Sequence, residues 1–188
     1  TYRMDVATRF RLQVMRPEVL ELMSEALATP EANIPVLRGR LYRQLKSVYE
    51  ELKQSGLQQF QFHLADNRSL LRFHLPQIAG DPIFNLRPSV RIANTEKREV
   101  SGFEVGRTVP AFRYVFPVAS EGRHLGSVEI SISFDRIQEN LSHLLAGGDF
   151  GLLLDKKTVL DTIDPANIEK FAGAPVHADF LIENPTVS

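Results

Sequence analysis

The chain has 188 residues, 43% of them hydrophobic, so it can bury the core of one domain, or of one domain and part of another. It carries 22 lysines and arginines against 23 aspartates and glutamates, a net charge of -1, which excludes binding of nucleic acid or of an anionic membrane by charge alone. The absence of cysteine excludes disulfides, thiolate metal sites and a cysteine nucleophile.

Membrane-spanning and export signals are missing from the sequence as it stands. No apolar run approaches the ~20 residues needed to cross a bilayer, and the first residues lack the apolar core and cleavage pattern of a signal peptide. We therefore expect a soluble chain that has been excised from a longer protein.

The first quarter of the sequence predicts helices. One apolar stripe at helical spacing runs through residues 35–56 and consists of Leu37, Leu41, Leu45, Val48 and Leu52. Residues 6–28 have a similar pattern, but Pro17 removes a backbone donor and must start, kink or break a helix. We expect two helices that are joined near residues 28–35.

From Leu57 the hydrophobic period changes to two, which predicts a β-hairpin. Phenylalanine and leucine alternate with polar residues on both sides of a turn sequence, and these polar residues are Gln61, His63, Arg72 and His74. If Asn67 and Arg68 form the turn, the antiparallel register pairs Phe62 with Phe73 and His63 with Arg72. One face of the hairpin is then apolar, and the other gathers imidazole and guanidinium groups.

Residues 87–99 predict a short helix, after which strands resume in residues 101–107, 110–119 and 123–134. The last hairpin has two alternative registers. We prefer a three-residue loop around Gly122 to a two-residue loop, because it pairs Arg113 with Ser131 and keeps each face uniform. The predicted polar face then gathers residues from five strands: His63, Arg72, His74, Glu104, Arg113, Glu129 and Ser131.

Asp135, with Gln138 three residues later, predicts the cap of a further helix that ends at Gly147 and Gly148. The remainder predicts a hairpin within residues 150–160 and a short helix at 166–171. We therefore divide the chain into a helical region (1–56), a strand module (57–148) and an extension (149–188) that is similar to the start of a second unit.

The order of these elements and several of their motifs resemble a known family. The motifs are FHLADNRSLLRFHLP, Gly80-Asp81, SGFEVGR, FRYVFPV and HLGSVEISISF, within residues 58–134. This stretch resembles the PAS-like, double-Cache sensory module of bacterial chemoreceptors, sensor histidine kinases and GGDEF proteins. The resemblance implies an α+β fold, in which long N-terminal helices pack on a five-stranded antiparallel sheet, with a short C-terminal extension. It also implies a periplasmic, extracytoplasmic domain of an inner-membrane receptor, with a ligand pocket over the sheet.

On the predicted polar face, the guanidinium groups of the arginines suit a bidentate contact to a carboxylate ligand. The candidate ligand-binding residues are His63, Arg72, His74, Glu104, Arg107, Arg113, Phe116 and Glu129. Arg107 falls on the opposite strand parity to Glu104, so a role at a strand end or on the surface is as well supported for it. A second interpretation stays open, in which Glu104 and Glu129 balance the positive charges within the fold.

Other functions are less well supported. The histidines and glutamates of the polar face are metal-ligand types, but the arginines beside them would repel a dication, so we expect no metal and no cofactor. No residue spacing indicates a nucleophile. An enzyme that uses a His/Glu acid-base pair is therefore the alternative function, after ligand binding. A third alternative is a structural spacer. The expected partners are a carboxylate or amino-acid-like small molecule and a second copy of the chain, bound through the N-terminal helices, and no nucleic acid.

Overall fold

A computed structural model of the chain describes residues 2–144, 151–174 and 177–183. The chain forms two compact units. The first consists of Thr1–Gly102 and Arg113–Ser131, and the second of Phe103–Phe112 and Ile132–Ser188. The boundary expected at residue 148 lies outside the described residues.

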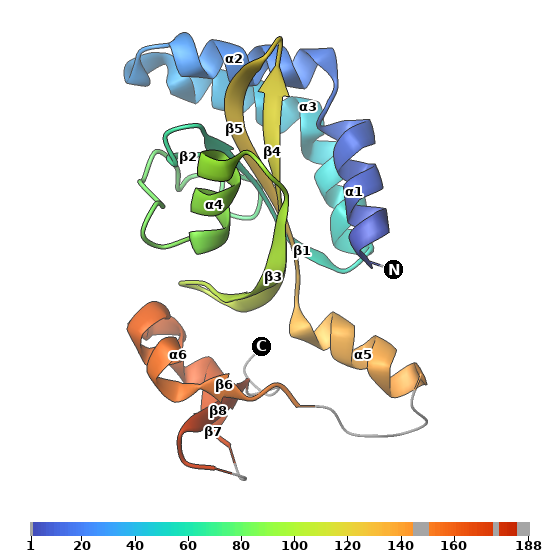
Figure 1. Cartoon of the computed structure of the whole chain (residues 1–188), viewed down its shortest axis with the longest axis vertical. Helices are drawn as coiled ribbons and strands as arrows, with labels where there is room; N and C mark the ends of the chain where they lie inside the picture. The colour runs from blue at the N-terminus through green and yellow to red at the C-terminus, as the bar shows by residue number, and fades with distance from the viewer. Residues whose placement is uncertain (1, 145–150, 175–176, 184–188) are drawn as a thin grey trace. The chain divides into compact units, whose positions relative to one another are not determined.

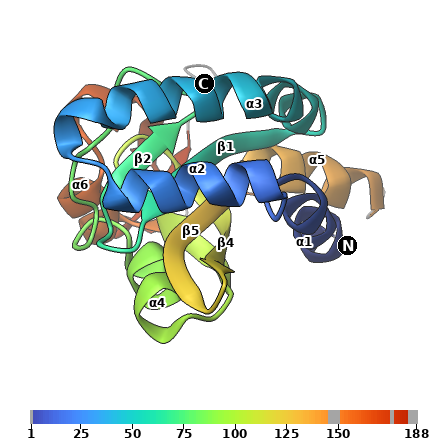
Figure 2. The same cartoon turned by 90° about the horizontal axis from the view of Figure 1, so that it is seen from above.

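The N-terminal part is helical, as predicted. Its elements are α1 (Tyr2–Gln13), α2 (Pro17–Ala28), a 3-10 turn (Glu31–Asn33) and α3 (Ile34–Gln54). Pro17 occupies the first position of α2, where its missing N–H costs no helical hydrogen bond, so it starts a helix and separates α1 from α2. The stripe predicted for the long helix is buried in α3. Figure 2 shows α2 and α3 running side by side.

Five strands form one antiparallel sheet, which confirms the predicted α+β fold class. The strands are β1 (Leu57–Leu64), β2 (Ser69–Arg72), β3 (Val100–Val105), β4 (Pro110–Ser120) and β5 (Arg123–Ile132). Their order in the sheet is β2-β1-β5-β4-β3. The short helix predicted after β2 is α4 (Pro88–Glu96). β5, the last of these five strands in sequence, therefore lies in the middle of the sheet, next to β1.

The predicted register of the first hairpin is wrong. Gln61 pairs with Arg72, Phe62 with Leu71 and His63 with Ser69, and the pairing is irregular between Phe62 and His63. As a result His63 does not lie opposite Arg72, and His74 follows the end of β2 in a turn.

The loop of this hairpin explains the shift in register. Four residues, 65–68, connect the strands, and Asn67 adopts the left-handed conformation with φ 64°. The side-chain amide of Asn94 in α4 donates to Asn67 Oδ1 (3.0 Å) and to the backbone oxygen of Leu64 (3.1 Å). A residue about 30 positions away therefore holds the loop in a form that turn propensity alone does not predict.

The loop of the last hairpin also differs from the preferred prediction. β4 ends at Ser120 and β5 begins at Arg123, so Glu121 and Gly122 alone make the turn. Their φ angles are 50° and 76°, and two consecutive positive φ values are typical of the type I′ turn that suits the twist of a hairpin. The three-residue loop is therefore wrong, although Arg113 still reaches the face of β5 that carries Glu129.

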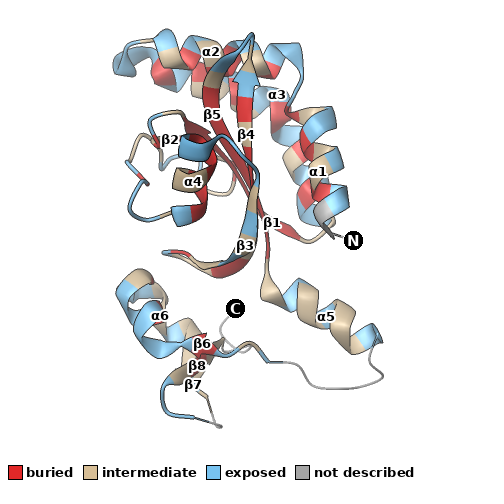
Figure 3. Ribbon diagram, viewed as in Figure 1, coloured by how far each residue is buried: buried red, intermediate tan, exposed pale blue. Residues whose placement is uncertain are grey.

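Helices cover both faces of the sheet in the first unit (Figure 1). On one face Phe10 of α1 stacks on Phe116 of β4, with ring centroids 4.4 Å apart. On the same side α3 packs against β1 and β2, and its Tyr42 stacks on Phe73 at 5.3 Å. On the other face α4 contributes to a small apolar cluster of Ile83, Val90, Ala93 and Val115. Burial is concentrated in β1, β4 and β5 (Figure 3).

The second unit has a small core of its own. Its elements are α5 (Phe134–Leu144), β6 (Leu154–Asp155), α6 (Lys156–Thr162), a 3-10 helix (Pro165–Lys170), β7 (Phe171–Gly173) and β8 (Phe180–Glu183). The three strands pair in the order β6-β8-β7. Four buried residues form the core: Leu154, Val159, Ile163 and Leu181.

Two local predictions in this unit need correction. α5 begins at Phe134, so Asp135 lies in its first turn rather than at its cap, and the predicted end at Gly147 and Gly148 lies outside the described residues. The hairpin predicted for residues 150–160 is wrong. Asp155 accepts a hydrogen bond from the Thr158 backbone N–H (2.7 Å), and this cap turns the chain into α6.

Candidate functional site

Seven polar residues of the central strands are buried on the sheet face that α4 covers. Val115 packs in the cluster beneath α4, and Arg113, two residues earlier on β4, lies on the same face. We call the group the polar layer; its members are Gln59, Gln61, His63, Arg113, Ser127, Glu129 and Ser131, each no more than 3% exposed. A buried polar layer is costly unless its groups are hydrogen-bonded, so its partners decide what it does.

An ion pair between Arg113 and Glu129 lies at the centre of the polar layer. Arg113 Nη1 donates to Glu129 Oε1, and both side chains are completely buried. The same nitrogen donates to Gln59 Oε1 (2.7 Å), and Gln61 Nε2 also donates to that oxygen (3.1 Å). The network therefore connects β1, β5 and β4, which are neighbours in the sheet.

The charge of Glu129 is retained in spite of its burial. Burial by itself would raise the pKa of the Glu129 carboxyl, but the nearby positive charges of Arg113 and Arg87 outweigh it. Together with the hydrogen bond from Arg113, they lower the pKa of Glu129 from 4.5 to about 2. Glu129 is therefore a carboxylate at neutral pH.

Histidine contributes neutral groups to the site. His63 Nδ1 lies 3.3 Å from Ser127 Oγ, and burial lowers the pKa of His63 from 6.5 to about 4. His74 is half-buried in the turn after β2, and burial likewise lowers the pKa of His74 to about 4. Both imidazoles are uncharged at pH 7, so each provides one donor and one acceptor.

The buried imidazole makes stability depend on pH. Because the pKa of His63 is about 4 when folded and 6.5 when unfolded, the unfolded chain binds more protons between these values. The contribution of His63 is complete above pH 6.5 and is lost as the pH falls toward 4. We expect His63 to account for a loss of about 2 kcal/mol between pH 6.5 and about pH 5, measured by urea unfolding. His63→Gln should flatten this dependence, whereas the same change at exposed His143 should leave it intact; equal slopes in both variants would contradict the assignment.

Arg72, which we predicted to bind a carboxylate ligand, forms an ion pair with Asp81 within the chain. Its two terminal nitrogens donate to the two oxygens of Asp81 (2.6 and 2.8 Å), and Nη1 also donates to the Ile78 backbone oxygen (2.9 Å). This bidentate contact is the one that was expected for a carboxylate ligand. In the structure it holds the segment after β2 against the strand.

The other predicted site residues lie elsewhere. Phe116 stacks on Phe10 of α1, so it faces the helices opposite the polar layer. Glu104 on β3 and Arg107 in the turn after it belong to the second unit. Arg107 Nη2 lies 3.5 Å from Asp164 Oδ2, and the Arg107 backbone oxygen accepts from the Asp164 N–H (2.8 Å). Of the eight candidates, the structure therefore brings together His63, Arg113 and Glu129. Arg72 and His74 lie close enough for electrostatic interactions with members of that group.

Several residues that shape the site were not among the candidates predicted from the sequence. Gln59 and Ser127 share the strand parity of His63 and Glu129, so the alternation itself carried a signal for them. Asp81 and Asn94 had no such signal, because their partners come from distant segments.

Several buried atoms of the polar layer have no hydrogen-bond partner among the described residues. They include His63 Nε2, Glu129 Oε2 and Ser131 Oγ. Native proteins pair nearly all such groups with protein or with ordered small molecules, and each unpaired group costs ~1–3 kcal/mol. A donor from a small polar molecule, water or a ligand, would satisfy the carboxylate oxygen.

Residues 16–181 match the model of a family described as the double sensory domain of two-component sensor kinase. The chain belongs to this family. No curated protein sequence matches the chain. The match confirms the double-Cache sensory type that the motifs indicated, together with its place in signal transduction.

Solved sensory domains share the fold of this sensory domain. The sensory domain of the Campylobacter jejuni chemoreceptor Tlp3, with isoleucine bound, has a TM-score of 0.55 and 14% identity, over 84% of this chain and 61% of that one. The sensor domain of the V. cholerae histidine kinase DctB has a TM-score of 0.52 and 16% identity, over 71% and 52%. The chain thus spans between half and two thirds of these domains. None of the helices described for it is apolar and long enough to cross a membrane.

Proposed function

We propose that this sensory domain binds a small amino-acid-like metabolite at the polar layer and that it is the extracytoplasmic part of a membrane-tethered receptor. The observation that carries the proposal is that His63 Nε2, Glu129 Oε2 and Ser131 Oγ are buried and have no hydrogen-bond partner within the part of the chain that the structure describes. They come from two neighbouring strands and lie beside an ion pair that keeps one carboxylate charged.

The polar groups match the two ends of an amino acid. Glu129 Oε2 is a buried, ionised acceptor, so it suits an ammonium group. At the edge of the layer, His74 Nδ1 has no hydrogen-bond partner among the residues that the structure describes, and the positive charge of Arg72 acts on the imidazole. These groups suit a carboxylate, although Arg72 would share its fork with Asp81. The anionic group of the ligand is therefore proposed for the edge and its cationic group for the interior.

Known ligands of similar structures are consistent with this assignment. The Tlp3 sensory domain has been crystallised with isoleucine and with L-valine, at TM-scores of 0.55 and 0.54 to this chain. These identities are 14% and 13%, so the likeness supports the class of ligand only through the shared fold.

Binding is better supported than catalysis at this site. A general acid or base is most effective when its pKa lies near the working pH. The pKa of His63 is lowered to about 4 and that of Glu129 to about 2, so neither group is poised to exchange a proton at pH 7. A receptor needs only that the ligand binds one arrangement of helices and sheet more tightly than another. We propose that dimers formed through the N-terminal helices transmit this difference.

A thermal-shift screen of amino acids and small carboxylates tests the proposal. We expect at least one compound to raise the melting temperature, because a ligand that binds only the folded state stabilises it by mass action. Ser131→Ala should weaken that compound about tenfold, the loss of one hydrogen bond to a charged group. Its unliganded melting temperature should stay the same or rise, since Ser131 Oγ has no hydrogen-bond partner in the described part of the chain.

Ser101→Ala is the matched control, because Ser101 is exposed on β3. This variant should bind the compound as the wild type does. The proposal fails if no compound stabilises the wild type, or if a compound stabilises the wild type and Ser131→Ala equally.

A further inference from the structure

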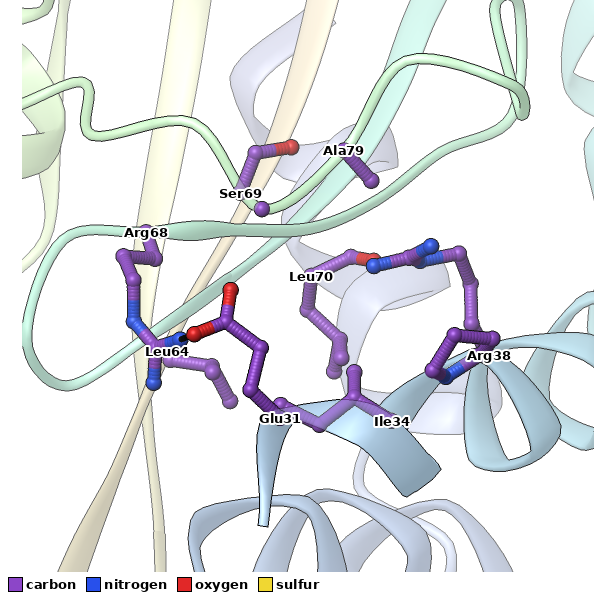
Figure 4. A pocket seen from close by; sticks show the side chains of 10 residues that line it. Glu31, Ile34, Arg38, Leu64, Arg68, Ser69, Leu70 and Ala79 are labelled. Atoms are coloured by element: carbon purple, nitrogen blue, oxygen red, sulfur yellow. Dashed lines mark hydrogen bonds and ion pairs between the residues drawn. The ribbon is translucent and has the colours of Figure 1, made fainter.

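A cavity lies between the start of α3 and the segment formed by β2 and residues 79–80 (Figure 4). Its volume is about 210 Å³, which is below the range of ~300–1,000 Å³ that holds drug-sized ligands, so it suits a molecule of a few heavy atoms. Its lining residues all belong to the first unit, and none of them is a member of the polar layer. The cavity is therefore distinct from the proposed amino-acid site.

One side of the cavity presents a positively charged group that is held in place. Arg38 of α3 is half-buried, and its Nε donates to the Leu70 backbone oxygen at 2.7 Å. Among residues 2–144, 151–174 and 177–183, no carboxylate forms an ion pair with Arg38. A guanidinium with one nitrogen tied to the backbone keeps further N–H groups for an acceptor.

The opposite side carries a second guanidinium with a weakly held carboxylate (Figure 4). Arg68 Nη1 lies 3.5 Å from Glu31 Oε2, and the Glu31 side chain is 75% exposed. Exposed pairs of this kind contribute ~0–1 kcal/mol, so another anion can displace Glu31 at little cost. Arg68 would keep its orientation, because its Nε also donates to Asp66 Oδ2 at 2.7 Å.

Part of the cavity lining is apolar. Ile34, Leu64 and Leu70 are buried and line it. The Ser69 hydroxyl points away from the two arginines, because Ser69 and Leu70 are consecutive residues of β2 and their side chains leave the strand on opposite sides (Figure 4).

We propose that this cavity is a binding site for a short-chain aliphatic carboxylate of two to four carbons. Its carboxylate lies between Arg38 and Arg68 in place of Glu31, and its alkyl group packs against Ile34 and Leu70. These apolar side chains disfavour inorganic phosphate, which would leave polar oxygens without partners beside them.

Sodium propionate is the probe, titrated into the isotopically labelled domain and followed by amide chemical shifts at constant ionic strength. We expect saturable shifts at Ser69, Leu70 and Gly80 with a dissociation constant of about a millimolar, as the few heavy atoms of the ligand allow. Arg38→Gln should weaken binding at least tenfold. Arg43→Gln, the same change at an exposed position of α3, should leave it unchanged.

Glu31→Gln gives an effect of opposite sign without risk to the fold, since Glu31 is exposed. It should tighten propionate binding several-fold, because it removes the competing carboxylate. The proposal is overturned if propionate causes no saturable shifts, if Arg38→Gln and Arg43→Gln bind equally, or if Glu31→Gln does not tighten binding. Shifts that vanish in Ser131→Ala would instead assign propionate to the polar layer, and phosphate binding as tight as propionate would overturn the ligand class.

Discussion

Replacing Arg113 with methionine should lower the free energy of unfolding by about 3–5 kcal/mol. The substitution removes the positive charge that pairs with Glu129 and leaves a completely buried carboxylate without its ion-pair partner. It also removes the hydrogen bond that Arg113 Nη1 donates to Gln59 Oε1 (2.7 Å). Urea unfolding followed by circular dichroism at neutral pH measures the difference.

The double variant Arg113→Met/Glu129→Leu should recover much of this loss, because an apolar pair of similar volume replaces the ion pair without leaving a buried charge. Arg136→Met is the matched control. Arg136 and Glu139 form an exposed pair on α5, so this variant should change stability by no more than about 0.5 kcal/mol. If Arg113→Met is as mild as Arg136→Met, the pair does not hold the polar layer together.

Replacing Gly126 with alanine should destabilise the protein by about 3 kcal/mol or more, among the largest effects of a single methyl group. A Cβ at this position would lie 1.9 Å from the backbone oxygen of His63, and the residue has φ 147°, which side chains rarely adopt. β1 and β5 are neighbours in the sheet, so the clash would force apart the two strands that carry most of the polar layer.

Gly102→Ala serves as the comparison, because a Cβ there would meet nothing within 4 Å. Gly102 lies on β3, where alanine replaces glycine at little cost. Thermal unfolding of the two variants separates the close approach of the strands from a general effect of glycine. Similar melting temperatures for Gly126→Ala and the wild type would show that β5 can move away from His63 freely.

The strand and helix content follows from local patterns in the sequence. The stripe in residues 35–56 predicted α3, and the period-two segments predicted all five strands of the sheet. The alternation of side chains along each strand also separated the two faces of the sheet correctly. Phe116 stacks on Phe10 on one side. Arg113 pairs with Glu129 on the other. In the first hairpin these features survive the wrong register, because the shift of two residues at Gln61 and Phe62 leaves both side chains on their own faces.

The register of both hairpins could not be obtained in this way. In the first, Asn94 holds the loop through Asn67, and that contact exists only once α4 packs over the strands. In the second, the choice between loops of two and three residues depends on small differences in turn energy that the sequence pattern does not resolve. The predicted opposition of His63 and Arg72 failed for the first of these reasons.

By itself, the sequence determined the α+β class, the family, and a polar set that included His63, Arg113 and Glu129, because alternation and motif order are properties of neighbouring residues. Only the tertiary structure decided which of these groups are already paired. Arg72 binds Asp81 and Arg113 binds Glu129, since ion pairs depend on distances between segments far apart in the chain. Among the described residues, the polar-layer atoms without a hydrogen-bond partner include His63 Nε2, Glu129 Oε2 and Ser131 Oγ, and these atoms support the ligand site that we propose there.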